Sequence, residues 1–126
     1  MKYIFFACLL LLSGCQTIQN VSSLLPRDHD PTLAGAFIET KIEINTLKCE
    51  TKDHPLEYTL WTAARTSSNY LREYASFRKD PQQESADAVN TNLKKAHEAE
   101  KLSVCNHWLK LAKIRLQVLE KAWGSR

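Results

Sequence analysis

The side chains in this chain that could do chemistry are four cysteines and four histidines. Cysteine thiolates act as nucleophiles, metal ligands or disulfide partners, and histidine acts as an acid, a base or a ligand. Two pairs lie close in sequence, Cys105 with His107 and His97 with Glu100, but their spacing does not match that of a zinc site. The sequence contains no glycine-rich phosphate loop and no Gly-x-Ser-x-Gly nucleophile motif. We therefore predict that the protein is not an enzyme and needs neither a metal nor another cofactor.

Cys15 stands in a sequence context that indicates lipid attachment. It directly follows Leu12-Ser13-Gly14, and before these come Lys2 and an apolar run over residues 3–12 that is too short for a permanent transmembrane helix. This arrangement resembles the signal sequence and lipobox of bacterial lipoproteins. The resemblance implies cleavage before Cys15, lipidation of its thiol and acylation of the new amino terminus. Because residue 16 is Gln16 rather than Asp, it also implies anchoring in the outer membrane, facing the periplasm or exposed at the cell surface.

The lipobox divides the chain into three parts. We expect a signal peptide over residues 1–14, a lipidated tether over residues 15–29 and one helical domain over residues 30–126. Removal of the signal leaves 16 basic and 14 acidic side chains, a net charge of +2 with histidine neutral. A charge this small favours no nucleic-acid partner. The expected partners are the membrane, through the lipid anchor, and an envelope protein or a second copy.

The domain is predicted to be all-α. Proline stands at three helix starts, after Asp30, His54 and Asp80, where its missing N–H costs nothing. Apolar residues recur at helical spacing after each start, which predicts helices over residues 31–49, 55–78 and 81–124. Short connections make these helices antiparallel neighbours. The expected architecture is an antiparallel three-helix bundle with a long C-terminal helix, or a four-helix bundle if that helix breaks.

Two cysteines remain once the signal is removed and Cys15 carries lipid. Cys49 ends the first helix, and the second helix takes about 25 residues to return, so the third regains the level of Cys49 near residue 106. Cys105 lies one position away. An exported compartment is oxidising enough to keep a disulfide. We therefore expect a Cys49–Cys105 disulfide.

The same arithmetic leaves residues 107–123 without a neighbour if the third helix is continuous. This segment would project about 25 Å beyond the other helices, and more than half of its surface is apolar. We expect it to bind a partner or a second copy, to pack on the tether, or to fold back after a break over residues 103–106. Neither Ser103 nor Asn106 breaks a helix as proline or glycine would, so we expect the continuous helix. The partner-binding residues are then Trp108, Leu111, Arg115, Leu116, Leu119 and Trp123. If the helix folds back instead, the expected site moves to the surroundings of Tyr70, Tyr74 and Arg78.

Two functions fit these expectations. The first is a protein-binding adaptor or accessory subunit of an envelope assembly, similar in architecture to the pilotins of secretion pores. The alternative is an inhibitory or exclusion lipoprotein, of the kind carried by phages and plasmids, that blocks an envelope receptor or enzyme. The sequence contains no motif that separates them.

Overall fold

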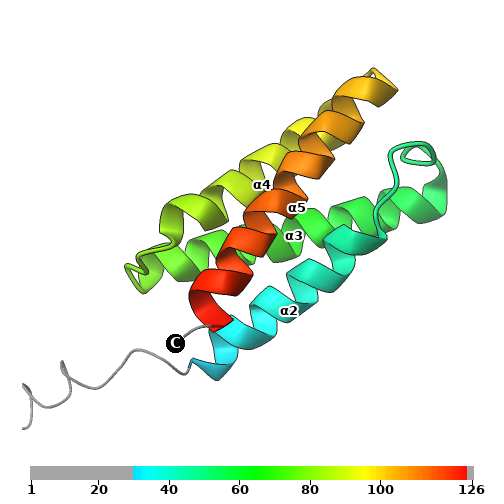
Figure 1. The fold of residues 1–126 in the computed structure, drawn as a ribbon. Helices are drawn as coiled ribbons and strands as arrows, with labels where there is room; N and C mark the ends of the chain where they lie inside the picture. The colour runs from blue at the N-terminus through cyan, green and yellow to red at the C-terminus, as the bar shows by residue number, and fades with distance from the viewer. Residues whose placement is uncertain (1–29, 125–126) are drawn as a thin grey trace, which may run out of the picture.

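The computed structural model describes residues 30–124, and these residues form four α-helices (Figure 1). There is no strand within that range, so the all-α prediction is confirmed for it. The helices are α2, Pro31–Thr46; α3, Pro55–Phe77; α4, Gln83–Glu98; and α5, Leu102–Gly124.

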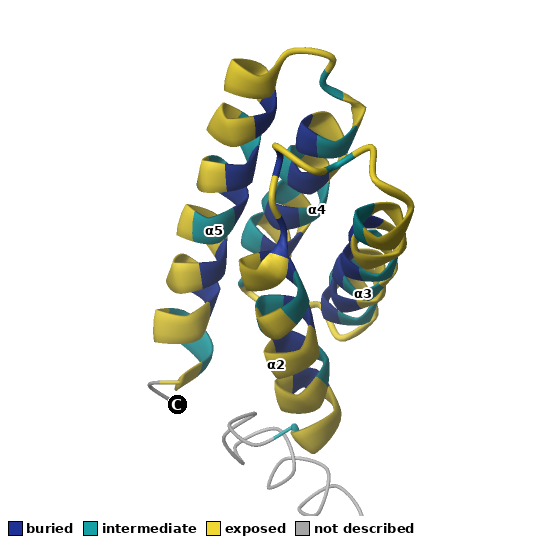
Figure 2. Cartoon of the chain, turned by 90° about the vertical axis from the view of Figure 1, so that its right-hand side faces the viewer, coloured by how far each residue is buried: buried dark blue, intermediate teal, exposed yellow. Residues whose placement is uncertain are grey.

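Each helix runs antiparallel to the one before it and packs on it (Figure 1). The packing order is α2 on α3, α3 on α4 and α4 on α5, and a smaller contact between α5 and α2 closes the arrangement. Figure 2 agrees with this packing, because the buried side of each helix faces the other helices. The expected alternative of four helices is therefore the one observed.

Local sequence explains where α2 and α3 begin. The Asp30 carboxylate accepts hydrogen bonds from the backbone N–H groups of Thr32 (3.0 Å) and Leu33 (3.3 Å), which have no partner inside the helix. His54 caps α3 through Nδ1, which accepts from the N–H of Leu56 at 3.4 Å. The third expected start differs, because residues 81 and 82 form a turn and α4 begins at Gln83.

The prediction of a continuous C-terminal helix is wrong. The chain leaves α4 at Ala99, which has extended backbone angles (φ −66°, ψ 130°), and it reverses before α5 begins at Leu102. The break lies a few residues before the expected segment, in a stretch that contains neither glycine nor proline. Part of the lost helical hydrogen bonding is replaced from outside, because the Lys52 ammonium donates to the carbonyl oxygen of Ala99. Folding back also buries the apolar side of α5, which a projecting helix would leave in water.

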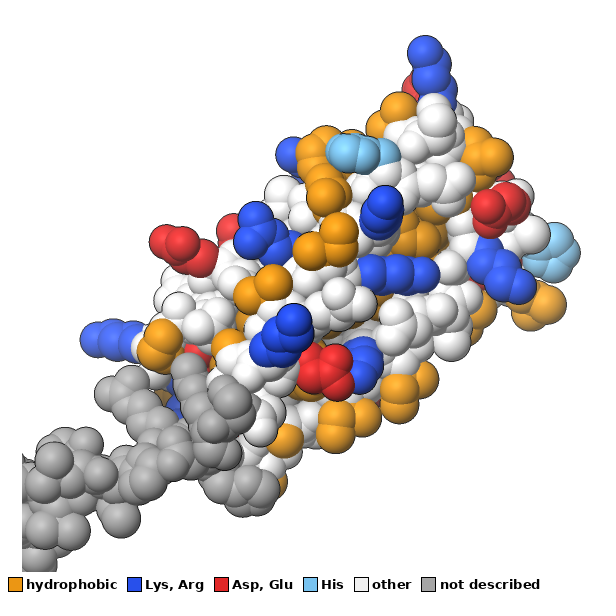
Figure 3. All heavy atoms as spheres, in the orientation of Figure 1, with side chains coloured by type: hydrophobic (Ala, Val, Ile, Leu, Met, Phe, Trp, Pro, Cys, Tyr) orange, Lys and Arg blue, Asp and Glu red, His pale blue; other side chains and the backbone are white. Residues whose placement is uncertain are grey.

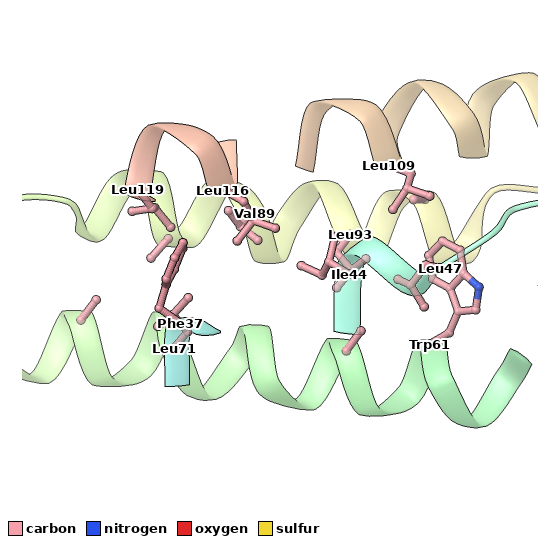
Figure 4. Packing of buried hydrophobic residues seen from close by; sticks show 14 of the residues in the cluster. Phe37, Ile44, Leu47, Trp61, Leu71, Val89, Leu93, Leu109, Leu116 and Leu119 are labelled. Carbon is pink, nitrogen blue, oxygen red and sulfur yellow. The ribbon is translucent and has the colours of Figure 1, made fainter. Parts of the chain in front are cut away.

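The core is one hydrophobic cluster, and all four helices contribute side chains to it (Figure 4). Its largest fully buried side chains include Trp61, Ile44, Leu71, Leu93 and Leu119. The Trp61 indole also donates to the backbone carbonyl of Lys48 at 3.4 Å, so this ring ties the end of the core to the loop after α2. Burial of such side chains contributes roughly 1.5–3 kcal/mol each, which makes this cluster the main source of stability.

Candidate functional site

The predicted disulfide pair is confirmed. The Cys49 and Cys105 sulfur atoms lie 2.10 Å apart, the Cα atoms are 5.9 Å apart, and both residues are buried. The reason for their proximity differs from the one expected. Cys105 lies in the first turn of α5, directly after the reversal, and so stays at the end of the bundle to which α4 returned. The prediction that Cys105 lies at the level of Cys49 is still correct, because the break between α4 and α5 and Cys105 lie at the same end of the bundle.

Four of the six predicted partner-binding residues belong to the core or pack against it: Leu116, Leu119, Trp123 and Trp108. Leu116 and Leu119 are 3% and 0% exposed. Trp123 is half-buried, its indole N–H donates to Asp80 Oδ1 at 3.1 Å, and its ring meets Phe37 edge to face. Leu116, Leu119 and Trp123 were expected to be exposed on a projecting helix, but the fold-back buries the two leucines and half-buries the tryptophan.

Trp108 lies on a second side of α5 together with the remaining two predicted residues, Leu111 and Arg115. Trp108 and Leu111 are half-buried and Arg115 is exposed, and the Lys95 ammonium stands 4.2 Å from the centroid of the Trp108 ring. Val104 and Val118, 39% and 40% exposed, extend the same helical spacing at both ends. We call this set the outer α5 row: Val104, Trp108, Leu111, Arg115 and Val118. Figure 3 shows hydrophobic side chains interleaved with lysine and arginine on this side of the molecule.

The fallback site around Tyr70, Tyr74 and Arg78 is only partly available. The Tyr74 hydroxyl donates to Asp30 Oδ2 at 3.0 Å, and the Arg78 guanidinium donates to the same oxygen. Burial disfavours the charged Asp30, but hydrogen bonds from the Leu33 N–H and Tyr74, together with Arg78, lower its pKa below the usual 3.8. Tyr74 and Arg78 therefore hold the start of α2, while Tyr70 stacks on Tyr74 and stays 51% exposed.

A polar cleft of about 750 Å³ lies between α3 and α4, with Arg65 and His97 on its walls. Arg65 Nη1 lies 3.2 Å from His97 Nδ1. A guanidinium can only donate, so Nδ1 accepts, and the histidine is neutral with its proton on Nε2. Burial lowers the pKa of His97 below 6.5, and the charges of Arg65 and Lys52 lower it further. The Trp61 ring stacks on the same imidazole. Sequence reasoning missed the Arg65–His97 contact because the two residues are 32 positions apart.

The structure gives one member of each of the two local pairs a different place or role from that of a metal ligand. Glu100 lies in the turn after α4 rather than on the helix beside His97, and Cys105 is bonded to Cys49. Within residues 30–124, no group of three His, Cys, Asp or Glu side chains is placed to hold a metal ion.

The predicted signal peptide and tether, including Cys15, lie outside the described residues. In the part of the chain that the structure does describe, no helix is long and apolar enough to span a membrane. Comparison of the chain with protein-family models, with curated proteins and with solved structures found no match.

Proposed function

We propose that this chain is a lipid-anchored, periplasm-facing lipoprotein of the outer membrane that binds a protein partner as an adaptor, in the manner of a pilotin. The lipobox-like sequence ending at Cys15 supports the anchor. The observation that carries the adaptor function is the outer α5 row, an apolar and basic stripe on a helix whose core positions are already filled.

The chemistry of α5 indicates the class of partner. The helix carries Lys110, Lys113, Arg115 and Lys121 against a single acidic residue, Glu120, which pairs with Lys41 at 2.5 Å. The outer α5 row has 4-3-4-3 spacing, and four of its five members are apolar, which fits the apolar face of another amphipathic helix. The partner segment we propose is therefore an amphipathic helix of an envelope protein with acidic residues beside its apolar stripe.

The anchor is tested by the Cys15→Ser variant in cells supplied with labelled palmitate. The wild type should incorporate the label, and the variant should not, because the thiol that receives the diacylglyceryl group is gone. Uncleaved precursor should accumulate at the same time. Palmitate incorporation that persists in Cys15→Ser would show that the lipobox assignment is wrong.

The docking surface is tested by a photo-crosslinking amino acid placed at the half-buried Leu111, with the same amino acid at Ile42, an apolar position on α2 that is 60% exposed, as the control. Leu111 should capture one envelope protein that Ile42 does not. That protein, once purified, should bind the Leu111→Lys variant about tenfold or more weakly than the wild type, since a buried interface position rarely tolerates a charge. Equal capture at both positions would refute the surface. If the captured protein is a receptor or enzyme that loses activity on binding, the exclusion function replaces the adaptor.

A further inference from the structure

Helix α3 carries a second row of residues on the side away from the core. Its buried side is formed by Trp61, Ala64, Ser68, Leu71 and Ala75. The opposite side is exposed apart from half-buried Ala63 (Figure 2). We call it the outer α3 row, with 4-3-4-3-4 spacing: Thr59, Ala63, Thr66, Tyr70, Glu73 and Phe77. This is the heptad spacing along which helices pair side by side.

The side chains of the outer α3 row suit close helix pairing. Threonine and alanine fill the first half of the row, so a second helix can approach closely there. Tyr70 and Phe77 in the second half are 51% and 83% exposed, and Phe77 is the more exposed of the two. Large aromatic surface in water is unfavourable, and a partner helix would cover it.

Two clefts of opposite charge flank this row. The cleft between α2 and α3, about 510 Å³, is lined by Glu39 and Glu43 and by no cation. The charged residues that line the cleft between α3 and α4 are three cations, Arg65, Arg72 and Lys94, and one carboxylate, Asp87. Thr62 and Thr66 line both clefts, so the two sit directly on either side of α3. The formal charge of the lining residues is −2 on the α2 side. It is +2 on the α4 side and falls to +1 when Glu73, which pairs with Arg72, is counted with them, so the two sides keep opposite signs.

We propose that α3 packs against α3 of a second copy of this chain, with the two helices parallel and a two-fold axis running along them. A rotation about that axis exchanges the two sides of the row, so the acidic cleft of each copy lies over the basic cleft of the other. An antiparallel pair would instead set acid against acid and base against base, which is repulsive. Charge complementarity thus selects both the occupant and its direction.

Glu73 is the one charged member of the row, and its charge is already balanced. Its carboxylate lies 2.5 Å from Arg72 Nη2 within the same copy. The two Glu73 side chains that meet across the axis therefore each bring a cation with them. In this dimer both Asp30 ends also lie at the same end of the assembly, as two anchors in one membrane would require.

Cysteine cross-linking distinguishes the two directions, because Thr66 is the midpoint of α3 and Thr59 and Glu73 each lie seven residues from it. In the full chain expressed in cells, the Thr59→Cys variant should form a disulfide-linked dimer with itself. Gln117→Cys, an exposed position on α5, is the matched control and should not. Coexpressed Thr59→Cys and Glu73→Cys chains should each give their own homodimer rather than a mixed one. A mixed dimer alone would overturn the parallel direction.

Charge reversal tests the electrostatic reasoning separately. Glu39→Lys/Glu43→Lys makes both sides of the row basic, and Thr91→Glu/Lys94→Glu makes the basic cleft acidic, using exposed positions on α4. Each variant alone should lose about tenfold or more of the Thr59→Cys cross-linking yield, and the two expressed together should recover it as mixed dimers. Circular dichroism of each purified variant checks that the helices remain.

Three further results would overturn the proposal. One is a Thr59→Cys yield no higher than that of Gln117→Cys, which would mean that the row is not a self-pairing surface. Another is that coexpression of the two charge-reversed variants fails to restore the Thr59→Cys cross-linking yield although both variants fold. The last is cross-linking of Thr59→Cys to a different protein, which would make the row a docking site for a partner. None of these results bears on palmitate incorporation or on capture at Leu111, so the proposed function stands or falls on its own tests.

Discussion

Leu119→Ala is the substitution that most directly tests whether α5 folds back. The Leu119 side chain is 0% exposed and lies near Phe37 and Leu116 in the core (Figure 4). Truncation removes buried carbon atoms and leaves a cavity that the surrounding helices fill only in part. Such Leu→Ala changes cost roughly 2–5 kcal/mol, and the complete burial of this side chain places our expectation at about 3 kcal/mol.

The expected shift in melting temperature follows from the size of the domain. About 1 kcal/mol corresponds to roughly 4–8 °C in a domain of this size, so Leu119→Ala should lower the melting temperature by about 15 °C. Far-ultraviolet circular dichroism of the purified protein measures the transition. Val118→Ala is the matched control, because it removes apolar atoms from the next residue of the same helix at 40% exposure. Its effect should stay below about 1 kcal/mol.

The reasoning would be refuted if Leu119→Ala melted within a few degrees of the wild type, since a helix that projects into solvent would lose nothing on truncation. A larger effect at Val118 than at Leu119 would refute it too, because it would mean that the core-facing side of α5 has been assigned wrongly. Loss of partner binding in Leu119→Ala with an unchanged melt would restore the projecting helix as the docking surface.

Three further predictions concern stability. Replacing both Cys49 and Cys105 with serine opens a loop set by their sequence separation of 56 and should cost about 4 kcal/mol in denaturant unfolding; a loss below about 1 kcal/mol would contradict it. Because the pKa of His97 is lowered in the folded state, the unfolded chain binds a proton at this residue first as pH falls. The free energy of unfolding should therefore rise with pH from below 6.5 and level off above it, and His97→Gln should flatten that slope. Because the pKa of the Asp30 carboxyl is lowered in the folded state, its contribution to stability is present above pH 3.8 and is lost as pH falls through the folded-state pKa. Asp30→Ala should therefore cost about 1–2 kcal/mol near neutral pH. An equal loss at low pH would contradict the ionised carboxylate as the cause.

The starts of α2 and α3 could be predicted from sequence because their causes are local. Asp30 and His54 precede a proline and cap backbone groups two or three residues away, so nothing distant is needed to place them. The disulfide pair was also within reach. Only two cysteines follow Cys15, and antiparallel helices of known rise bring them to one end of the domain.

The sequence offered the break between α4 and α5 only as the alternative to a continuous helix, because the causes of the break are distant in sequence. Residues 99–101 contain no helix breaker, and the Lys52 side chain that caps the Ala99 carbonyl comes from the loop after α2. The stronger cause is the gain from burying one side of α5, which exists only when α4 and α2 are there to cover it.

The candidate site divides in the same way. The sequence shows that α5 has apolar residues on two neighbouring sides, and Leu116 and Leu111 are equally apolar in that pattern. Only the packing decides that Leu116 enters the core, while Leu111 stays half-buried and Arg115 exposed. The Arg65–His97 contact and the opposite charges on either side of α3 likewise join residues from different helices. A helical sequence determines which residues share a side of one helix, but the neighbour that covers that side is set by the free energy of the whole bundle.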